Sequence, residues 1–200
     1  MMYLLPILSV FWGLAIAVII SIKASNLKLL LTFSGAFLLS VLCFELLPDV
    51  FGALGKKAGI WIFLGIVLQI VLEFFSKGAE HGHVHAATEK MFPLGVVISL
   101  CIHSFFEGIP LAQNHALIFG VSLHKLPVAM VLSAFLIQHR FKTINLLLIL
   151  VLFAAATPLG VFVGRYWSAE TAILLPLNAL VAGILLHVST TLILESNEKH

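Results

Sequence analysis

Seven long apolar runs, separated by short polar breaks, limit what this chain can fold into more than any other feature. They span residues 2–22, 29–54, 58–76, 91–113, 116–138, 143–164 and 171–194. A helix needs about 20 mostly apolar residues to cross the hydrocarbon core of a bilayer. Charged residues make up only 10% of the 200 residues, against about 25% in an average soluble domain. We therefore expect an all-α polytopic transmembrane helical bundle, with seven spans in a single domain over residues 1–200.

Charge, cysteines and the N-terminal sequence exclude several other classes of protein. The net charge is +2 without a basic patch, so nucleic acid is not an expected partner. Cys43 and Cys101 lie inside apolar runs without CxxC spacing, which favours buried packing residues over a disulfide or a metal pair. Residues 1–23 lack a basic start and a small-residue cleavage site. They predict a first spanning helix rather than a signal peptide.

Basic residues in the polar breaks indicate which side of the membrane each break faces, because cytoplasmic loops are enriched in lysine and arginine. With the N-terminus outside, the inner breaks contain Lys23, Lys28, Lys77, Lys90, Arg140, Lys142 and Lys199. The outer breaks then contain Lys56, Lys57 and Arg165. Because the inner set is larger, we predict an outside N-terminus and a cytoplasmic loop at residues 77–90.

The predicted cytoplasmic loop contains the sequence HGHVH, which includes His81, His83 and His85. Alternating histidines in a polar segment are a weak signature of metal binding. This loop could therefore collect metal ions or sense their level. An inert, solvated loop is the alternative interpretation.

The fourth apolar run carries His103 and Glu107, which are four residues apart and so share one helix face. An imidazole nitrogen and a carboxylate oxygen at this spacing can bind one metal ion. Pro110 has no N–H to donate to the carbonyl of Phe106, which loosens the helix there. A purely structural, hydrogen-bonded His–Glu pair is the alternative to a metal site.

His124 lies in the fifth run, about as far after the short turn at residues 113–115 as His103 lies before it. A short turn makes the two helices antiparallel neighbours, so the two histidines should lie at similar depth. Together with Glu107 they form a mixed nitrogen and oxygen set that suits zinc and related divalent ions.

Lys125 is the unexpected neighbour of this set, because a fixed cation beside a metal ion would repel it. It could be neutral, extend toward the interface, or pair with a carboxylate such as Glu107, Glu45 or Glu73. Our hypothesis is that Lys125 occupies the place where a second metal ion would otherwise bind.

Three other polar residues in the apolar runs are candidates for the metal pathway or for support of the ligands. Glu45 and Asp49 are four apart and flank Pro48 near the outer end of the second run. They could attract cations into a vestibule, or form a carboxylate pair at a wet helix end. His187 in the seventh run is typical of a hydrogen-bonded packing residue, with a ligand as the alternative.

Several motifs resemble those of the ZIP family of metal transporters, in the branch with an HK motif. The matching sequences are HSFFEG at 103–108, HKLPVA at 124–129, GAFLLSVLCFELLPD at 35–49, TPLGVFVG at 157–164 and ALVAGILLHVS at 179–189. The resemblance covers nearly the whole chain in order. It implies transport of zinc, and often iron, manganese or cadmium, into the cytoplasm. It also implies an outside N-terminus and often a homodimer.

The resemblance places the transport site between spans four and five and implies that His103, Glu107 and His124 are the metal ligands. Ser104 stands where some members have asparagine. Acidic residues of other members are replaced here by Lys125 and Val128, which argues for one bound metal ion rather than two. The family usually has eight spans, so a chain with seven is either truncated or an unusually short member.

The leading functional hypothesis is therefore a transporter of divalent metal cations, most of all zinc, and not an enzyme. An intramembrane zinc-dependent hydrolase could use the same ligands, but an HExxH sequence is absent. A membrane scaffold without transport is the third alternative. We expect a multi-pass protein of a plasma (inner) membrane.

Overall fold

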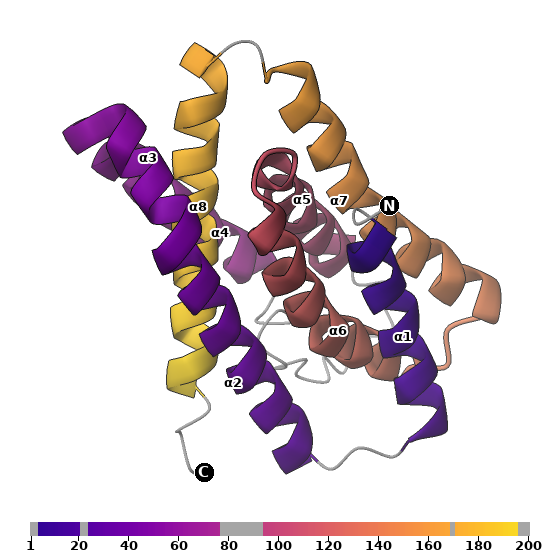
Figure 1. Cartoon of the computed structure of the whole chain (residues 1–200). Coiled ribbons are helices and arrows are strands. Elements are labelled where there is room, and N and C mark those ends of the chain that lie inside the picture. The colour runs from indigo at the N-terminus through magenta and orange to yellow at the C-terminus, as the bar shows by residue number, and fades with distance from the viewer. Residues whose placement is uncertain (1–3, 21–23, 77–93, 169–170, 196–200) are drawn as a thin grey trace.

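The computed structural model describes residues 4–20, 24–76, 94–168 and 171–195, and within these ranges every regular element is helical. The α-helices are α1 (Leu5–Ile19), α2 (Ala24–Val41), α3 (Leu47–Leu54), α4 (Ala58–Ser76), α5 (Leu94–Leu111), α6 (His115–Gln138), α7 (Thr143–Tyr166) and α8 (Thr171–Glu195) (Figure 1). A π-helical turn, η2 (Leu42–Leu46), joins α2 to α3, and a 3₁₀ turn, η3 (Gly55–Lys57), joins α3 to α4. The all-α prediction is confirmed for the described residues.

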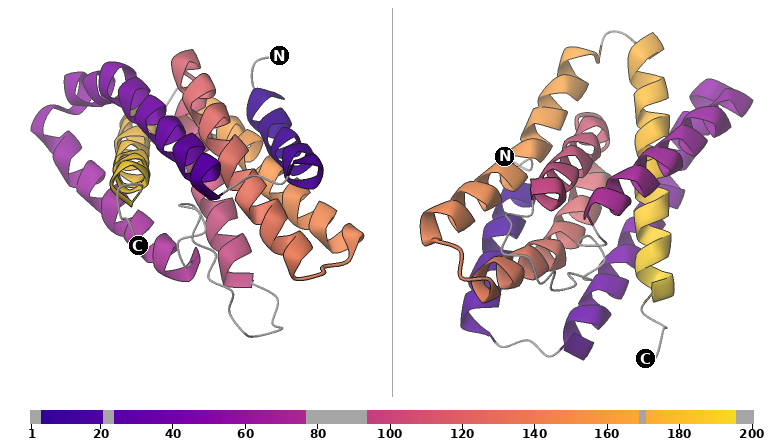
Figure 2. Two further views of the ribbon diagram at one scale, coloured as in Figure 1. Left: turned by 90° about the horizontal axis from the view of Figure 1, so that it is seen from below. Right: turned by 180° about the vertical axis from the view of Figure 1, so that it is seen from behind.

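Five helical runs in the described part of the chain are long and apolar enough to cross a membrane, whereas hydropathy predicted seven spans. The first predicted span corresponds to α1, which has only 15 residues. The second and third correspond to one 52-residue run, Ser25–Ser76. A straight helix of that length would measure about 78 Å, far more than the ~30 Å bilayer core. Gly55, at φ 54°, turns the run, so that α3 and α4 diverge (Figure 2).

The outer surface of the described residues is rich in large apolar side chains, and a set of polar and charged side chains is buried among the apolar residues of the core. Large apolar side chains lie on the outside, among them Trp12, Phe44 and Phe74, which are 63%, 78% and 79% exposed. Buried polar and charged residues include Ser34, Gln69, Ser99, His103, Ser104, Glu107, His124, Lys125, Ser133, Thr157 and Ser189. An apolar exterior together with charged residues buried inside the bundle fits a helical protein in lipid. The chain is thus an integral membrane protein.

Helices α5 and α6 form the centre of the bundle (Figures 1 and 2). Helix α7 packs on α5, α1 packs on α6, and α8 contacts both α2 and α4. A short turn joins α5 to α6, and Asn114 caps the second helix by accepting hydrogen bonds from the N–H groups of Ala116 (3.1 Å) and Leu117 (3.3 Å). A short, capped turn therefore links the two central helices.

Glycines set the closest approaches between these helices. A Cβ atom on Gly160 of α7 would overlap the carbonyl oxygen of Phe105, and one on Gly108 of α5 would overlap that of Thr157. Small residues at a crossing let two helix backbones come together, which is a main source of helix association in lipid. The position of Glu107, next to Gly108, therefore depends on this α5–α7 contact.

We predict that Gly160→Ala destabilises the protein, because the new methyl group must push the backbone of α5 away. Overpacking of this kind costs about 1–3 kcal/mol. The matched control is Gly52→Ala in α3, where a Cβ atom would meet nothing within 4 Å. That control should be neutral or stabilising by up to about 1 kcal/mol, because alanine favours helix. Thermal unfolding of the two purified variants in detergent would contradict the prediction if their midpoints agreed.

Candidate metal centre

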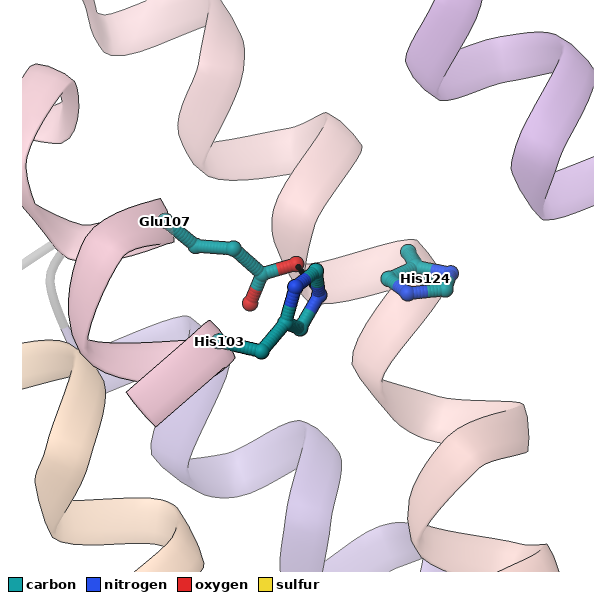
Figure 3. Close-up of side chains that lie close together, drawn as sticks. All are labelled: His103, Glu107 and His124. Carbon is teal, nitrogen blue, oxygen red and sulfur yellow. Dashed lines mark ion pairs between the residues drawn. The ribbon is translucent and has the colours of Figure 1, made fainter. Parts of the chain in front are cut away.

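His103 and Glu107 of α5 contact one another across one helical turn, as their spacing predicts. The Nε2 atom of His103 lies 3.0 Å from Oε1 of Glu107. Both side chains are buried, at 2% and 0% exposure. They extend from α5 toward the space between α5 and α6 (Figure 3).

His124 of α6 faces this pair from the neighbouring helix (Figure 3). The ring centroids of His103 and His124 are 6.3 Å apart, and the ring planes are inclined by 80°. One potential ligand atom from each of His103, Glu107 and His124 lies within 4.8 Å of the other two. The structure therefore brings together all three residues predicted as ligands, and all three are buried. We refer to them as the His–Glu–His group.

Lys125 pairs with Glu107, and not with the other two carboxylates considered from the sequence. Its Nζ atom lies 3.1 Å from Oε2 of Glu107 and donates a 2.6 Å hydrogen bond to Oγ of Ser104. The Nζ atom also lies 4.5 Å from the centroid of the Phe153 ring. Since Lys125 is 1% exposed, it does not extend to the interface. The ammonium group thus holds one carboxylate oxygen of Glu107, while His103 contacts the other.

Gln69 of α4 joins the group from a third helix. Its Oε1 atom accepts a 3.0 Å hydrogen bond from Nδ1 of His103. The sequence offered only one signal for this role. Gln69 and Glu73 are two polar residues four apart in an apolar span, so they share a helix face that points away from lipid.

The other predicted candidates lie outside the His–Glu–His group. His187 of α8 contacts Glu73 of α4, with 2.7 Å between Nε2 and Oε2, and both side chains are partly exposed. Glu45 in η2 and Asp49 in α3 are exposed. His81, His83 and His85 lie outside the described residues. The structure therefore separates one buried three-residue group from peripheral polar positions.

The chemistry of the His–Glu–His group fits a divalent metal ion. Two imidazoles and one carboxylate form a donor set that zinc sites use, often with water as a fourth ligand. Ligand atoms around tetrahedral zinc are about 3.4 Å apart, given bond lengths of about 2.1 Å. Separations of up to 4.8 Å require a small inward movement of the side chains. The group can therefore accept a metal ion but does not form a closed cage.

Comparison with known proteins identifies the family. Residues 76–200 match the family model described as ZIP Zinc transporter, and this segment includes the whole His–Glu–His group. A curated relative, Zinc transporter 8 from Oryza sativa subsp. japonica, is 24% identical over 141 residues. The match covers 56% of this chain and 36% of the relative, so it spans about a third of that protein. No solved structure matches the chain. Because the family model matches more than half of its length, this chain belongs to the ZIP zinc transporter family.

Proposed function

We propose that this protein transports divalent metal cations, most of all zinc, into the cytoplasm through the His–Glu–His group between α5 and α6. The observation that carries the proposal is the burial of three ligand side chains, with their ligand atoms within 4.8 Å, inside a membrane bundle. Ionisable residues at such positions are costly and usually mark an ion pathway. The similarity to Zinc transporter 8 of rice supports zinc as the cargo.

Transport requires a site that binds well enough to select its ion and weakly enough to release it. Three mixed ligands at separations wider than a relaxed zinc site meet this requirement better than a closed four-cysteine cage. The free cysteines of the described residues, Cys43 and Cys101, are not part of the group. This donor set therefore favours passage of the metal over permanent storage.

The proposed direction rests on an outside N-terminus with seven crossings, formed by α1, the α2–α3 run, α4, α5, α6, α7 and α8. In Figure 1 the start of α2 and the end of α8 lie at the lower end of the bundle, while the end of α3 and the start of α8 lie at the upper end. Lys28 belongs to the first turns of α2, and Lys56 and Lys57 belong to η3, directly after α3. The larger number of basic residues predicted for the inner breaks favours a cytoplasmic lower end.

Polar residues outside the group extend the proposed path in both directions. Glu45 and Asp49 precede the turn at Gly55, on the proposed outer side, where they would attract cations. The Glu73–His187 pair lies toward the ends of α4 and α8, on the proposed cytoplasmic side. We propose that ions then reach the loop that contains His81, His83 and His85.

The proposal predicts that a His103→Ala, Glu107→Ala double variant loses most zinc uptake, because two of three ligands are removed. The loss is measured as the uptake of radiolabelled zinc into proteoliposomes that contain the variant or the native protein. The matched control is His139→Ala at the end of α6, whose ring packs on Phe135 and lies outside the group. Elemental analysis after competition between zinc, iron, manganese and cadmium would identify the preferred ion. Full flux in the double variant would refute the assigned site.

Lys125 supports the binding of one ion rather than two. Its ammonium group already occupies Oε2 of Glu107 and Oγ of Ser104, which are the oxygens that a second cation would need. A nearby positive charge also opposes a second divalent ion directly. We propose that Lys125 replaces that second ion as the fixed counter-charge of Glu107.

Lys125→Ala is therefore expected to raise the amount of zinc bound per chain and to change the uptake rate, because it frees both oxygens. Lys28→Ala on the exposed side of α2 is the matched control and should change neither quantity. The proposal that Lys125 replaces a second ion is tested by elemental analysis of the metal content and by uptake measurements on the same preparations. A Lys125→Ala protein with unchanged stoichiometry and unchanged transport would disprove it.

A further inference from the structure

We infer that Gln69 is a positioning residue that fixes the ring of His103 so that Nε2, and not Nδ1, is presented to the transported metal ion. This inference rests on the proposed function, because it assigns a role to a residue that supports the His–Glu–His group. Gln69 lies on α4, before the segment that matches the family model, and is 34 residues away from His103 in the sequence.

The hydrogen bond itself determines which nitrogen is available. The Oε1 atom of Gln69 can only accept, so Nδ1 of His103 must carry the proton that it donates across 3.0 Å. The opposite ring nitrogen, Nε2, then faces Oε1 of Glu107 at 3.0 Å. A ring rotation that exchanged the two nitrogens would break both contacts. Gln69 thus sets both the orientation and the tautomer with which His103 binds a metal ion.

The backbone of α4 holds Gln69 firmly in this position. Gly65, one helical turn earlier, approaches α8 so closely that a Cβ atom there would overlap the carbonyl oxygen of Leu180. On α8, Gly183 makes the reciprocal approach to the carbonyl oxygen of Ile62. Gln69 is fully buried, so its amide has no bulk water to use in exchange for His103. The acceptor is therefore provided by a rigid helix rather than by a mobile loop.

An amide has a particular consequence for a site that must release its ion. Metal-binding histidines usually donate their second N–H to a carboxylate, a carbonyl oxygen or water, and the partner tunes the basicity of the ligand. A carboxylate partner would add negative charge and strengthen binding. The neutral amide of Gln69 fixes the ring without adding charge. Gln69 would therefore orient the ring of His103 and also keep the zinc affinity of the His–Glu–His group moderate, so that the ion can be released.

The first test compares Gln69→Leu with Gln113→Leu. The control removes the amide of the exposed Gln113, whose Oε1 accepts a hydrogen bond from Nδ2 of Asn178 outside the His–Glu–His group. Zinc-binding isotherms are measured on both purified variants and on the native protein. The isotherm of the His103→Ala, Glu107→Ala double variant is subtracted from each, so that binding at other sites does not contribute. Gln69→Leu should weaken zinc binding by about 10- to 100-fold, and Gln113→Leu should not. Equal affinities in the two variants would overturn the inference.

The second test reads the ring directly. Nitrogen-15 NMR of zinc-loaded, histidine-labelled protein distinguishes a metal on Nε2 from a metal on Nδ1, and the His103 signals are assigned by their loss in His103→Ala. The native protein should show a proton on Nδ1 and metal on Nε2, while Gln69→Leu should show a mixture or a loss of the signal. Metal on Nδ1 of His103 in the native protein would overturn the inference.

A conservative variant keeps the inference testable if Gln69→Leu does not fold. Gln69→Glu retains an acceptor for the Nδ1 proton, so metal should remain on Nε2, zinc affinity should rise, and the maximal uptake rate should fall. If Gln69→Glu changed neither the zinc affinity nor the maximal uptake rate, the role assigned to the neutral amide of Gln69 would be overturned. A different result would refute the proposed function itself: His103→Ala, Glu107→Ala protein that binds and transports zinc like the native protein.

Discussion

A carboxylate inside a membrane-spanning bundle is costly unless charged and hydrogen-bonding partners surround it, and the centre of this protein is organised around that constraint. Glu107 divides its two oxygens between different partners, with Oε1 at His103 and Oε2 at Lys125. A metal ion bound between His103 and His124 would use the first oxygen and leave the lysine contact intact. Glu107 would therefore keep a positive partner both before the ion arrives and after it leaves, which avoids an unpaired buried charge in either state.

This arrangement depends on helices that approach one another closely. The glycines at 108 and 160 bring α5 against α7, and those at 65 and 183 bring α4 against α8. The first contact fixes the helix that carries His103 and Glu107, and the second fixes the helix that carries Gln69. Lipid chains are as apolar as leucine side chains, so close backbone packing replaces the hydrophobic effect as the source of helix association. The geometry of the polar centre is thus set by residues that have no polar side chains.

Much of this could be predicted from the sequence, because lipid imposes strict rules on length and polarity. The span predicted at 58–76 coincides with α4, and the His–Glu spacing in α5 placed both side chains on one face. Hydropathy alone did not reveal that α1 has only 15 residues, nor that the run Ser25–Ser76 is continuous helix except for a turn at Gly55. The contacts of Gln69 with His103, and of Glu73 with His187, join different helices, over separations of 34 and 114 residues. Periodicity within one helix carries no information about which helix lies opposite.

The charges of the central group would also limit its affinity for a divalent ion. Glu107 and Lys125 cancel, so the protein side chains of the group, with neutral histidines, do not neutralise the two charges of an incoming ion. An ion on Oε1 of Glu107 would lie one carboxylate group away from the ammonium, at about 5–6 Å. At an effective dielectric constant of about 20, their repulsion is about 6 kcal/mol, which offsets part of the attraction of Glu107. A second carboxylate in place of Lys125 would remove this repulsion and deepen the site. In the proposed mechanism, Lys125 would therefore weaken the binding of the ion by ligands that could otherwise retain it.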